Sequence, residues 1–541
     1  MSRHARRTFI NDETAEALRR LIDPSRLRLW PVIWVVAVCI SATVIGLAGP
    51  NWLASRGHQL AEPRITAAGP ASPPARVCGN DAMLGGGPSS APPGAVTVPA
   101  GDNSAIDWGQ RHTTYWFAPG VHTLGSGQYT QIFPGTGSTF TGAPGAVLDG
   151  KRTNYYAFGG EARGVTISYL TIRGFGRRGG NQDEGVVNHN SAAGWTIDHS
   201  TLEDNAGAGT MLGSRNTLSF NCLRDNQQYG FSAYSRAGPA HIVIDHNEIT
   251  GNDTYNWEKR NPGCGCTGGG KFWNVNGAVI KGNWVHRNHS VGLWADTNNR
   301  GFDIEGNYIE GNYSSGLIYE ISYNALIKGN AFVRNGLGAG PANPGFPTGA
   351  IYLSESGSDS RVPGKYGHTF AITQNTFKNN WGGVILWENA DRFCASPANT
   401  STGDCTLVNP GVVTVKTCNA GNIAHRPFYS DCRWKTQNVS VNHNIFDFSP
   451  ASIGPACTIS NDCGIQGIFS QFGSYPSWSP YRGFVAENHI MFDQNNHFSA
   501  NIYKGPWRFM AHEQGNVVPW VLWQGSPYDQ DGNSTTNTRG A

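Results

Sequence analysis

The sequence predicts an all-β protein, a right-handed parallel β-helix solenoid preceded by one N-terminal transmembrane helix. The clearest observation is an internal repeat in residues 278–324, where Ile280 and Ile304 are 24 positions apart, as are Asp296 and Glu320. A fixed period of this length is typical of solenoids, in which each repeat stacks on the previous one to bury a shared core. The other two observations are the spread of this repeat along the chain and the abundance of Gly and Asn.

The repeat extends over eight predicted coils. Most are 21 to 26 residues long, and the longer intervals carry insertions. An Asn follows three residues after the opening aliphatic residue in all coils but one, and a second Asn follows five residues later in all but the last. The opening residues are Ile197, Leu218, Ile244, Ile280, Ile304, Ile327, Ile372 and Val441.

Short runs of alternating apolar residues lie between the Asn positions and predict strands of three to five residues separated by turns. The 70 Gly residues suit tight turns. Asn suits them because it tolerates left-handed backbone and its amide can bond to the backbone. In register, stacked Asn amides can also pair between coils. The chain lacks the Leu framework of a leucine-rich horseshoe and the blades of about 40 residues of a propeller.

The N-terminal region predicts a membrane anchor. Residues 1–29 are Arg-rich and form a predicted cytoplasmic tail, and residues 30–49 contain no charge and are long enough to span a bilayer. Residues 50–94 are rich in Pro, Ala and Gly and predict an extended linker. Residues 95–541 form the predicted extracytoplasmic β-helix domain, which is secreted if the N-terminal segment is instead a cleaved signal peptide.

Charge and cysteine usage agree with an exported protein. Charged residues make up 14% of the chain and the formal net charge is +2, so no nucleic-acid partner is indicated. Ten Cys lie outside the apolar segment, and an even number in an exported chain suggests disulfides. Short separations predict staples at Cys394–Cys405, Cys418–Cys432 and Cys457–Cys463, whereas Cys264 and Cys266 lack a second pair at zinc spacing.

The coils IKGNWVHRN, IEGNYIEGN and IDHNEITGN resemble the right-handed parallel β-helix repeats of the pectate-lyase-like superfamily, from about Ala95 to Ser534. The resemblance implies the fold and an extracytoplasmic role on carbohydrate. The superfamily contains polysaccharide lyases, glycoside hydrolases, uronate epimerases and non-catalytic modules. The paired Asp signature of polygalacturonases and the Tyr-Gly-x-Asp-Pro-His signature of alginate epimerases are missing.

One column of the predicted stack carries carboxylates. It lies sixteen residues after the opening aliphatic residue, and it contains Asp296, Glu320 and Glu388, which are the predicted catalytic residues. Neighbouring coils are about 4.8 Å apart. Like charges this close raise one pKa, and paired carboxylates serve glycoside hydrolysis. The predicted substrate-binding residues around them are Trp294, Tyr319, Trp387, Tyr234, His189, Glu355, Lys271 and Arg392.

Alternatives to hydrolysis remain open at this stage. A lyase or epimerase needs a base and a cation that holds the substrate carboxylate, for which Lys271 and Arg392 are candidates, with His189 or a Tyr as second proton donor. A non-catalytic module would bind glycan through the aromatic side chains. The sequence identifies no certain cofactor. Calcium stays open as an alternative, because oxygen ligands on adjacent coils suit a hard cation. The sequence therefore predicts a polysaccharide partner, with a glycoside hydrolase as the first choice.

Overall fold

The structure is a computed structural model, and it describes residues 69–234, 240–362, 369–389, 412–414, 416–419, 421–422, 425–471, 485–513 and 515–536. None of the helices within these ranges combines the length and the apolar character needed to cross a bilayer. The predicted tail 1–29 and membrane span 30–49 lie outside the described residues.

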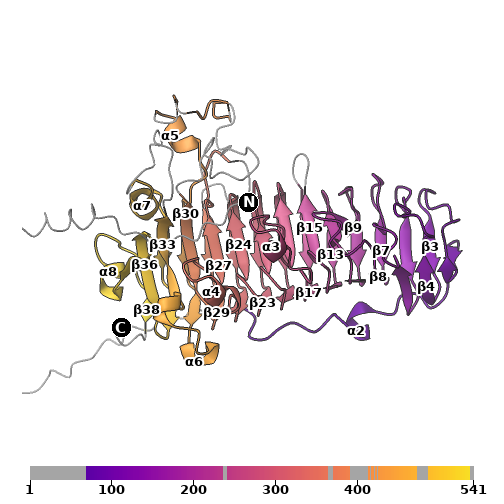
Figure 1. The fold of residues 1–541 in the computed structure, drawn as a ribbon, viewed down its shortest axis with the longest axis horizontal. Coiled ribbons are helices and arrows are strands. Elements are labelled where there is room, and N and C mark those ends of the chain that lie inside the picture. The colour runs from indigo at the N-terminus through magenta and orange to yellow at the C-terminus, as the bar shows by residue number, and fades with distance from the viewer. Residues whose placement is uncertain are drawn as a thin grey trace, which may run out of the picture. The chain divides into compact units, whose positions relative to one another are not determined.

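The described chain winds into three sheets whose strands lie side by side, from the indigo strands β3 and β4 to the yellow β36 (Figure 1). All pairings between neighbouring coils are parallel, and the one antiparallel pair joins the last two strands of the third sheet. The first sheet contains β1 (Val96–Val98), β3 (Thr114–Phe117), β5 (Thr139–Gly142), β7 (Thr166–Ser168), β10 (Thr196–Asp198), β13 (Thr217–Ser219), β16 (Ile242–Asp245), β19 (Asn276–Lys281), β22 (Arg300–Glu305), β25 (Tyr323–Lys328), β28 (Phe370–Thr373), β31 (Val439–Asn442) and β34 (His497–Ser499).

The second and third sheets follow the first within each coil. The second contains β2 (Gly101–Asp102), β4 (Gly120–Thr123), β6 (Ala146–Asp149), β8 (Thr171–Arg173), β11 (Thr201–Glu203), β14 (Cys222–Arg224), β17 (Glu248–Thr250), β20 (Trp284–His286), β23 (Tyr308–Glu310), β26 (Ala331–Val333), β29 (Thr376–Lys378), β32 (Ile445–Asp447), β35 (Ile502–Lys504) and β38 (Thr535–Thr536). The third contains β9 (Gly185–Val187), β12 (Ala208–Leu212), β15 (Phe231–Tyr234), β18 (Gly270–Trp273), β21 (Leu293–Ala295), β24 (Leu317–Glu320), β27 (Ile351–Ser354), β30 (Val384–Asn389), β33 (Ile465–Gln471), β36 (Arg508–Glu513) and β37 (Val517–Val518).

Short helices lie in the connections and insertions between strands. They are α2 (Asp81–Leu84), α3 (Trp257–Arg260), α4 (Ala339–Ala342), α5 (Phe428–Asp431), α6 (Pro450–Ile453), α7 (Val485–Asn488), α8 (Trp520–Gln524), the 3-10 helix η2 (Ile459–Asn461) and the π-helical turn η3 (His489–Asp493).

The predicted alignment of the coils is confirmed. The opening aliphatic residues pair with one another from Ile197 in β10 to Val441 in β31. All of them are buried in one continuous apolar core. Because every second side chain of a strand points to the same face, this register also fixes which residues of each coil point outward.

Two ladders of buried Asn side chains join the coils. In the first, the backbone N–H and the side-chain amide of Asn283 both donate to Oδ1 of Asn307, and Asn307 repeats this with Asn330. The second ladder, which includes Asn288, Asn312 and Asn335, has the same geometry. These bonds satisfy the backbone at the corners, where the sheet hydrogen bonds stop.

The left-handed residue at each corner is the one before the ladder Asn. Gly282 and Gly306 have φ values of 63°, whereas in other coils His199 and His246 occupy this position. Asn274, Asn298 and Asn324 have left-handed backbone at other turns, with φ values of 53°, 64° and 62°, as the sequence suggested, whereas the ladder Asn does not. Its role is the ladder, for which its side chain needs both a donor and an acceptor.

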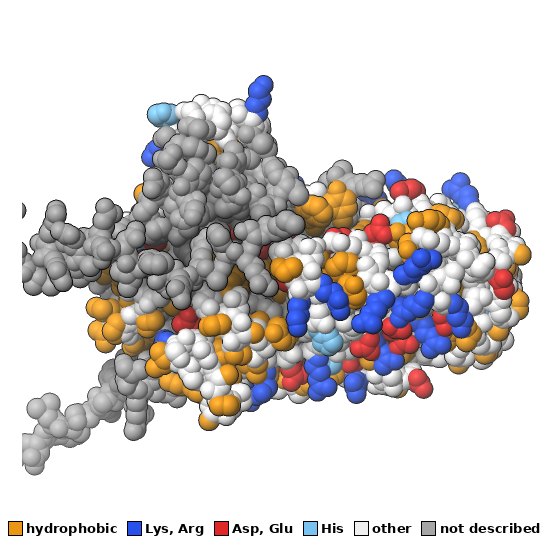
Figure 2. Space-filling view, viewed as in Figure 1, with side chains coloured by type: hydrophobic (Ala, Val, Ile, Leu, Met, Phe, Trp, Pro, Cys, Tyr) orange, Lys and Arg blue, Asp and Glu red, His pale blue; other side chains and the backbone are white. Residues whose placement is uncertain are grey.

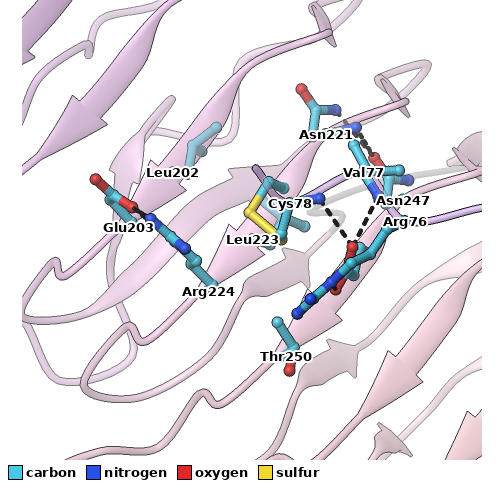
Figure 3. Close-up of a disulfide and its surroundings, with 12 residues drawn as sticks. Arg76, Val77, Cys78, Leu202, Glu203, Asn221, Leu223, Arg224, Asn247 and Thr250 are labelled. Atoms are coloured by element: carbon cyan, nitrogen blue, oxygen red, sulfur yellow. Dashed lines mark hydrogen bonds and ion pairs between the residues drawn. A yellow bond between two sulfur atoms is a disulfide. The ribbon is translucent and has the colours of Figure 1, made fainter. Parts of the chain in front are cut away.

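Residues 69–84 pack across the outer face of the second sheet. Cys78 forms a disulfide with Cys222, and Glu248 accepts hydrogen bonds of 2.8 Å from both Val77 N and Cys78 N (Figure 3). A Cβ on Gly69 would lie 2.2 Å from the carbonyl carbon of Asn330, so only glycine fits there. Within the predicted linker over 50–94, residues 69–84 are therefore attached to the solenoid by the disulfide and by the buried Glu248 carboxylate.

The remaining described cysteines are paired in insertions. The predicted staples Cys418–Cys432 and Cys457–Cys463 are confirmed, and Cys264 is bonded to Cys266. The predicted Cys394–Cys405 staple lies outside the described residues.

Charges of both signs are interspersed on the visible surface (Figure 2). On the outer face of the second sheet, Arg173 pairs with Asp149 at 3.2 Å, and Arg224 pairs with Glu203. The outer face of the second sheet thus carries ion pairs and the covering segment 69–84.

We expect Asn307→Ala to destabilise the solenoid by about 3 kcal/mol, because it removes several buried hydrogen bonds worth about 1 kcal/mol each. The lost bonds include those from Nδ2 to Ile280 O at 2.8 Å and to Asn330 Oδ1 at 2.9 Å. The urea midpoint of unfolding measures the effect, with the exposed Gln182→Ala as the control. An unchanged midpoint for Asn307→Ala would contradict a stabilising ladder.

Candidate active site

A groove of about 690 Å³ lies over the outer face of the third sheet. Strands from β12 to β30 form its floor, and the insertion after β17 forms one wall. The lining residues are Asp183, Met211, Tyr229, Ser232, Ala233, Tyr234, Glu258, Gly263, Cys264, Gly265, Lys271, Trp273, Trp294, Asp296, Thr297, Ile318, Glu320, Ile321, Phe346, Tyr352 and Trp387.

Asp296 and Glu320 occupy neighbouring coils of this groove. Ala295 pairs with Tyr319, so each carboxylate follows its paired residue on adjacent strands. Neighbouring strands are about 4.8 Å apart, which is also the expected separation of the two positions. The structure therefore brings together two of the three predicted catalytic carboxylates in one groove.

Lys271 holds the Asp296 carboxylate. Its Nζ lies 2.8 Å from Oδ2 of Asp296 and 4.1 Å from the ring centre of Trp294, and it also donates to the carbonyl of Gly265. Burial alone would raise the pKa of Asp296, but the charge and hydrogen bond of Lys271, with Thr297, hold this pKa below its ordinary value. Asp296 is therefore ionised at neutral pH.

The loop that contains the Cys264–Cys266 disulfide positions Lys271 beside Asp296. Gly265 lies between Cys264 and Cys266, and the Glu258 carboxylate of α3 accepts hydrogen bonds from Gly263 N and Gly265 N. The loop thus presents the Gly265 carbonyl to Lys271. The pair Cys264–Cys266, which the sequence identified only as an improbable zinc ligand set, shapes one wall of the groove.

Aromatic side chains flank the carboxylates on both sides. Trp273 is 45% exposed and its ring centre lies 5.9 Å from that of Tyr234. On the other side, Tyr352 lies 5.2 Å from Phe346 and 5.7 Å from Trp387. The exposed ring of Trp273 is suited to stack on a sugar, whereas Tyr352 and Trp387 are only 3% and 8% exposed.

Glu388 does not belong to the carboxylate column. Ser354 pairs with Glu320 on one neighbouring strand and with Trp387 on the other. Trp387, and not Glu388, therefore shares the row of Glu320. The turn from Asn380 to Val384 is one residue shorter than the turn from Asn312 to Leu317, so counting sixteen residues overshoots by one.

The Glu388 side chain is fully buried in an ion pair instead. It pairs with Arg433 and accepts hydrogen bonds from Thr436 N at 3.0 Å and from Nε2 of Gln494 at 2.7 Å. Glu388 is thus a structural residue that anchors the insertion before β31, and its predicted catalytic place in the column is wrong.

Three other predicted positions also lie away from the groove surface. Tyr319 points into the core, where its ring packs against Phe370 with centres 4.9 Å apart. Glu355 is buried at a corner and accepts hydrogen bonds from Ser354 Oγ and Asn389 N. His189 stacks on Tyr156 several coils away.

For Tyr319 and His189 the reason is strand register. Tyr319 alternates inward because Ile318 points outward. Gly185 pairs with Ala208 and not with Gly209, which moves His189 out of the expected column. The predicted binding residue Arg392 lies outside the described residues.

Trp273, Phe346, Asp183 and Glu258 line the groove and escaped the sequence prediction. Trp273 is the neighbour of Asp296 in the outward row, but the insertion at 253–277 hid its register. The sequence of its strand, Gly270–Trp273, could have revealed this position, since Phe272 aligns with Ala295 and Trp273 therefore aligns with Asp296. The other three come from loops, whose positions no repeat spacing specifies.

No three His, Cys, Asp or Glu side chains in the described part of the chain gather closely enough to hold a metal ion. The Asp529–Asn533 turn resembles the start of a calcium loop in sequence, but its Asp531 has a structural role. Asp531 is buried and accepts hydrogen bonds from Asn501 at 3.0 Å and from Trp523 at 2.6 Å, so it ends the first Asn ladder.

Residues 184–365 match the family model described as the right handed beta helix region. This match agrees with the three parallel sheets of the described chain, and the predicted right-handed parallel β-helix fold is confirmed. Comparison with curated proteins returns no match.

Several solved structures are similar to this chain at low identity and low TM-score. The mannuronan C-5 epimerase AlgE4 A-module of Azotobacter vinelandii is 17% identical over 55% of this chain and 85% of its own, with a TM-score of 0.39. The periplasmic alginate epimerase AlgG is 14% identical over 68% and 73%, with a TM-score of 0.33. Pectate lyase Pel9A is 14% identical over 57% and 78%, with a TM-score of 0.28.

We expect Arg433→Met to lower the free energy of unfolding by about 3–5 kcal/mol, because it leaves the Glu388 carboxylate buried without its cation. Thermal or urea unfolding measures this loss. The exposed Lys378→Met on β29 is the matched control. Equal stability of the two variants would show that Glu388 does not depend on this ion pair.

We also expect Lys271→Met to destabilise the protein at pH 7 more than at pH 3. The pKa of Asp296 is lowered in the folded state, so its ion pair contributes stability above the unfolded pKa of about 3.9, and this is lost as the pH falls through the folded pKa. The gap in melting temperature between wild type and variant should narrow on acidification. A gap that is constant with pH would rule out this linkage.

Proposed function

We propose that the protein is an exported glycoside hydrolase that acts on a polysaccharide in the groove of the third sheet. The observation that carries the proposal is the pair Asp296 and Glu320 on adjacent coils, between the aromatic faces of Trp273 and Trp387. Paired carboxyl groups flanking a sugar-sized groove are what glycosidic hydrolysis requires.

The two carboxyl groups differ in environment, which supports different roles. Asp296 is kept ionised by Lys271 and serves as nucleophile or base. Glu320 then donates a proton to the leaving glycosidic oxygen. In a retaining reaction Asp296 forms an ester with the anomeric carbon as the alcohol leaves, and water, deprotonated by Glu320, hydrolyses that ester and restores both carboxyl groups.

The strand spacing favours retention over inversion. Retaining enzymes hold their carboxyl groups about 5–5.5 Å apart, and inverting ones about 6.5–9.5 Å apart. Adjacent coils at about 4.8 Å match the first class. Glu388, two coils from Glu320, would have supplied the wider separation, but it is buried with Arg433.

A lyase or epimerase acting on a uronate fits the described groove less well. Such a substrate needs a cation for its carboxylate. Lys271 is the one Lys or Arg among the described lining residues, and it is already bonded to Asp296 and Gly265. A non-catalytic glycan-binding module remains the outcome if no bond is broken.

We expect Asp296→Asn and Glu320→Gln each to lower hydrolysis at least about 100-fold, as loss of a catalytic acid or base does. The full chain is incubated with plant, algal and cell-wall polysaccharides, and new reducing ends are measured. Glu305→Gln, in β22 on the same coil as Glu320 but in the first sheet, should keep wild-type activity.

Three results would overturn this assignment. Ultraviolet-absorbing unsaturated ends would show elimination, and changed uronate stereochemistry would show epimerisation. Full activity of Glu320→Gln would place the chemistry elsewhere. The anomer released first, read by NMR, tests retention separately from hydrolysis.

A further inference from the structure

The groove carries an excess of negative charge. Its described lining contains the carboxylates of Asp183, Glu258, Asp296 and Glu320 and the ammonium group of Lys271, a formal charge of −3. Because Lys271 lies 2.8 Å from Asp296, these two charges compensate each other locally. Since Glu320 is the proposed proton donor, Asp183 and Glu258 set the charge that a ligand meets.

These carboxylates are distributed along the groove and are not confined to the proposed reaction centre. Asp183 is exposed and accepts hydrogen bonds from Gln228 at 3.1 Å and Tyr229 at 3.2 Å. Glu258 lies in α3 of the insertion after β17, and Gln228 joins this insertion to the Asp183 loop by donating to Asp183 and to the carbonyl of Cys266. The pKa of Tyr229 is raised, first by burial and then by Asp183 and Asp296, which places both carboxylates within electrostatic range of the groove floor.

Three buried polar atoms of the described lining have no hydrogen-bond partner among the described residues. They are Oγ of Ser232, Nε1 of Trp294 and Nε1 of Trp387. Buried donors normally find a partner, and each one left without costs free energy. Because these atoms are covered, the ligand is inferred from the charge of the lining and not from them.

A ligand that fits these features combines sugar hydroxyls with positive charge. Like charges in a cleft with low-dielectric walls repel strongly, so a polyuronate is disfavoured, whereas a protonated amine is attracted. We propose that the substrate is a polysaccharide containing unacetylated amino sugars, whose ammonium groups face Asp183 and Glu258. This inference rests on the proposed function of the same groove.

Two oligosaccharides of equal length and backbone isolate the effect of charge. Chitosan hexamer carries ammonium groups, and chitin hexamer carries neutral acetamides in the same positions. We expect the full-length Glu320→Gln protein to bind the chitosan hexamer at least about tenfold more tightly at low salt in calorimetry. The preference should shrink as salt screens the carboxylates.

Asp183→Asn in the same background should reduce the preference several-fold, while Glu305→Gln on the first sheet should preserve it. Equal binding of the two hexamers, or tighter binding of a polyuronate, would overturn the inference. Hydrolysis of a neutral polysaccharide with equal hexamer binding would leave the proposed function intact and remove only the amino-sugar assignment. If both hexamers bind but the wild-type protein cleaves no polysaccharide, the proposed hydrolase activity is overturned. The ratio of the two hexamer affinities then still decides whether the groove prefers amino sugars.

Discussion

The stacking of coils through the Asn ladders and the inward aliphatic columns is the constraint on which the rest of the structure depends. Each ladder Asn bonds forward to the next coil and back to the carbonyl of the previous one, as Asn307 does with Asn330 and Ile280. These bonds fix the register of the corners, and the buried Ile column fixes that of the strands. With both fixed, every outward position on the third sheet has a defined neighbour one coil away, including Asp296 beside Glu320.

The site is built by departures from this regular scaffold. The insertion after β17 carries α3 and the Cys264–Cys266 loop, which presents the Gly265 carbonyl to Lys271. Lys271 in turn orients Asp296 and packs against Trp294. A regular coil provides spacing but no walls, so the groove needs the insertions to exclude water and to position the charged groups. The covering segment 69–84 does the opposite on the second sheet, where it closes the outer face.

The comparison of Glu320 with Glu388 shows how little separates a groove residue from a structural one. A turn shorter by one residue moves Trp387 into the outward row and leaves Glu388 beneath the insertion, paired with Arg433. In a strand the side-chain period is two, so a shift of one residue exchanges the two faces. The same rule places Tyr319 in the core although it adjoins Glu320 in sequence.

The sequence by itself determined the fold, the coil register and the pair Asp296 and Glu320, because these depend on a local repeat of 24 residues from Ile280 to Ile304 and of 23 from Ile304 to Ile327. It also indicated Lys271, Trp294 and Trp387 as groove residues. Only the tertiary structure showed that Glu388, Glu355 and His189 lie outside the groove. It also showed how residues 69–84 pack and that Asp183 and Glu258 line the groove. Those depend on turn lengths and on loops that meet the stack from far along the chain, and contacts of that kind leave no periodic trace in the sequence.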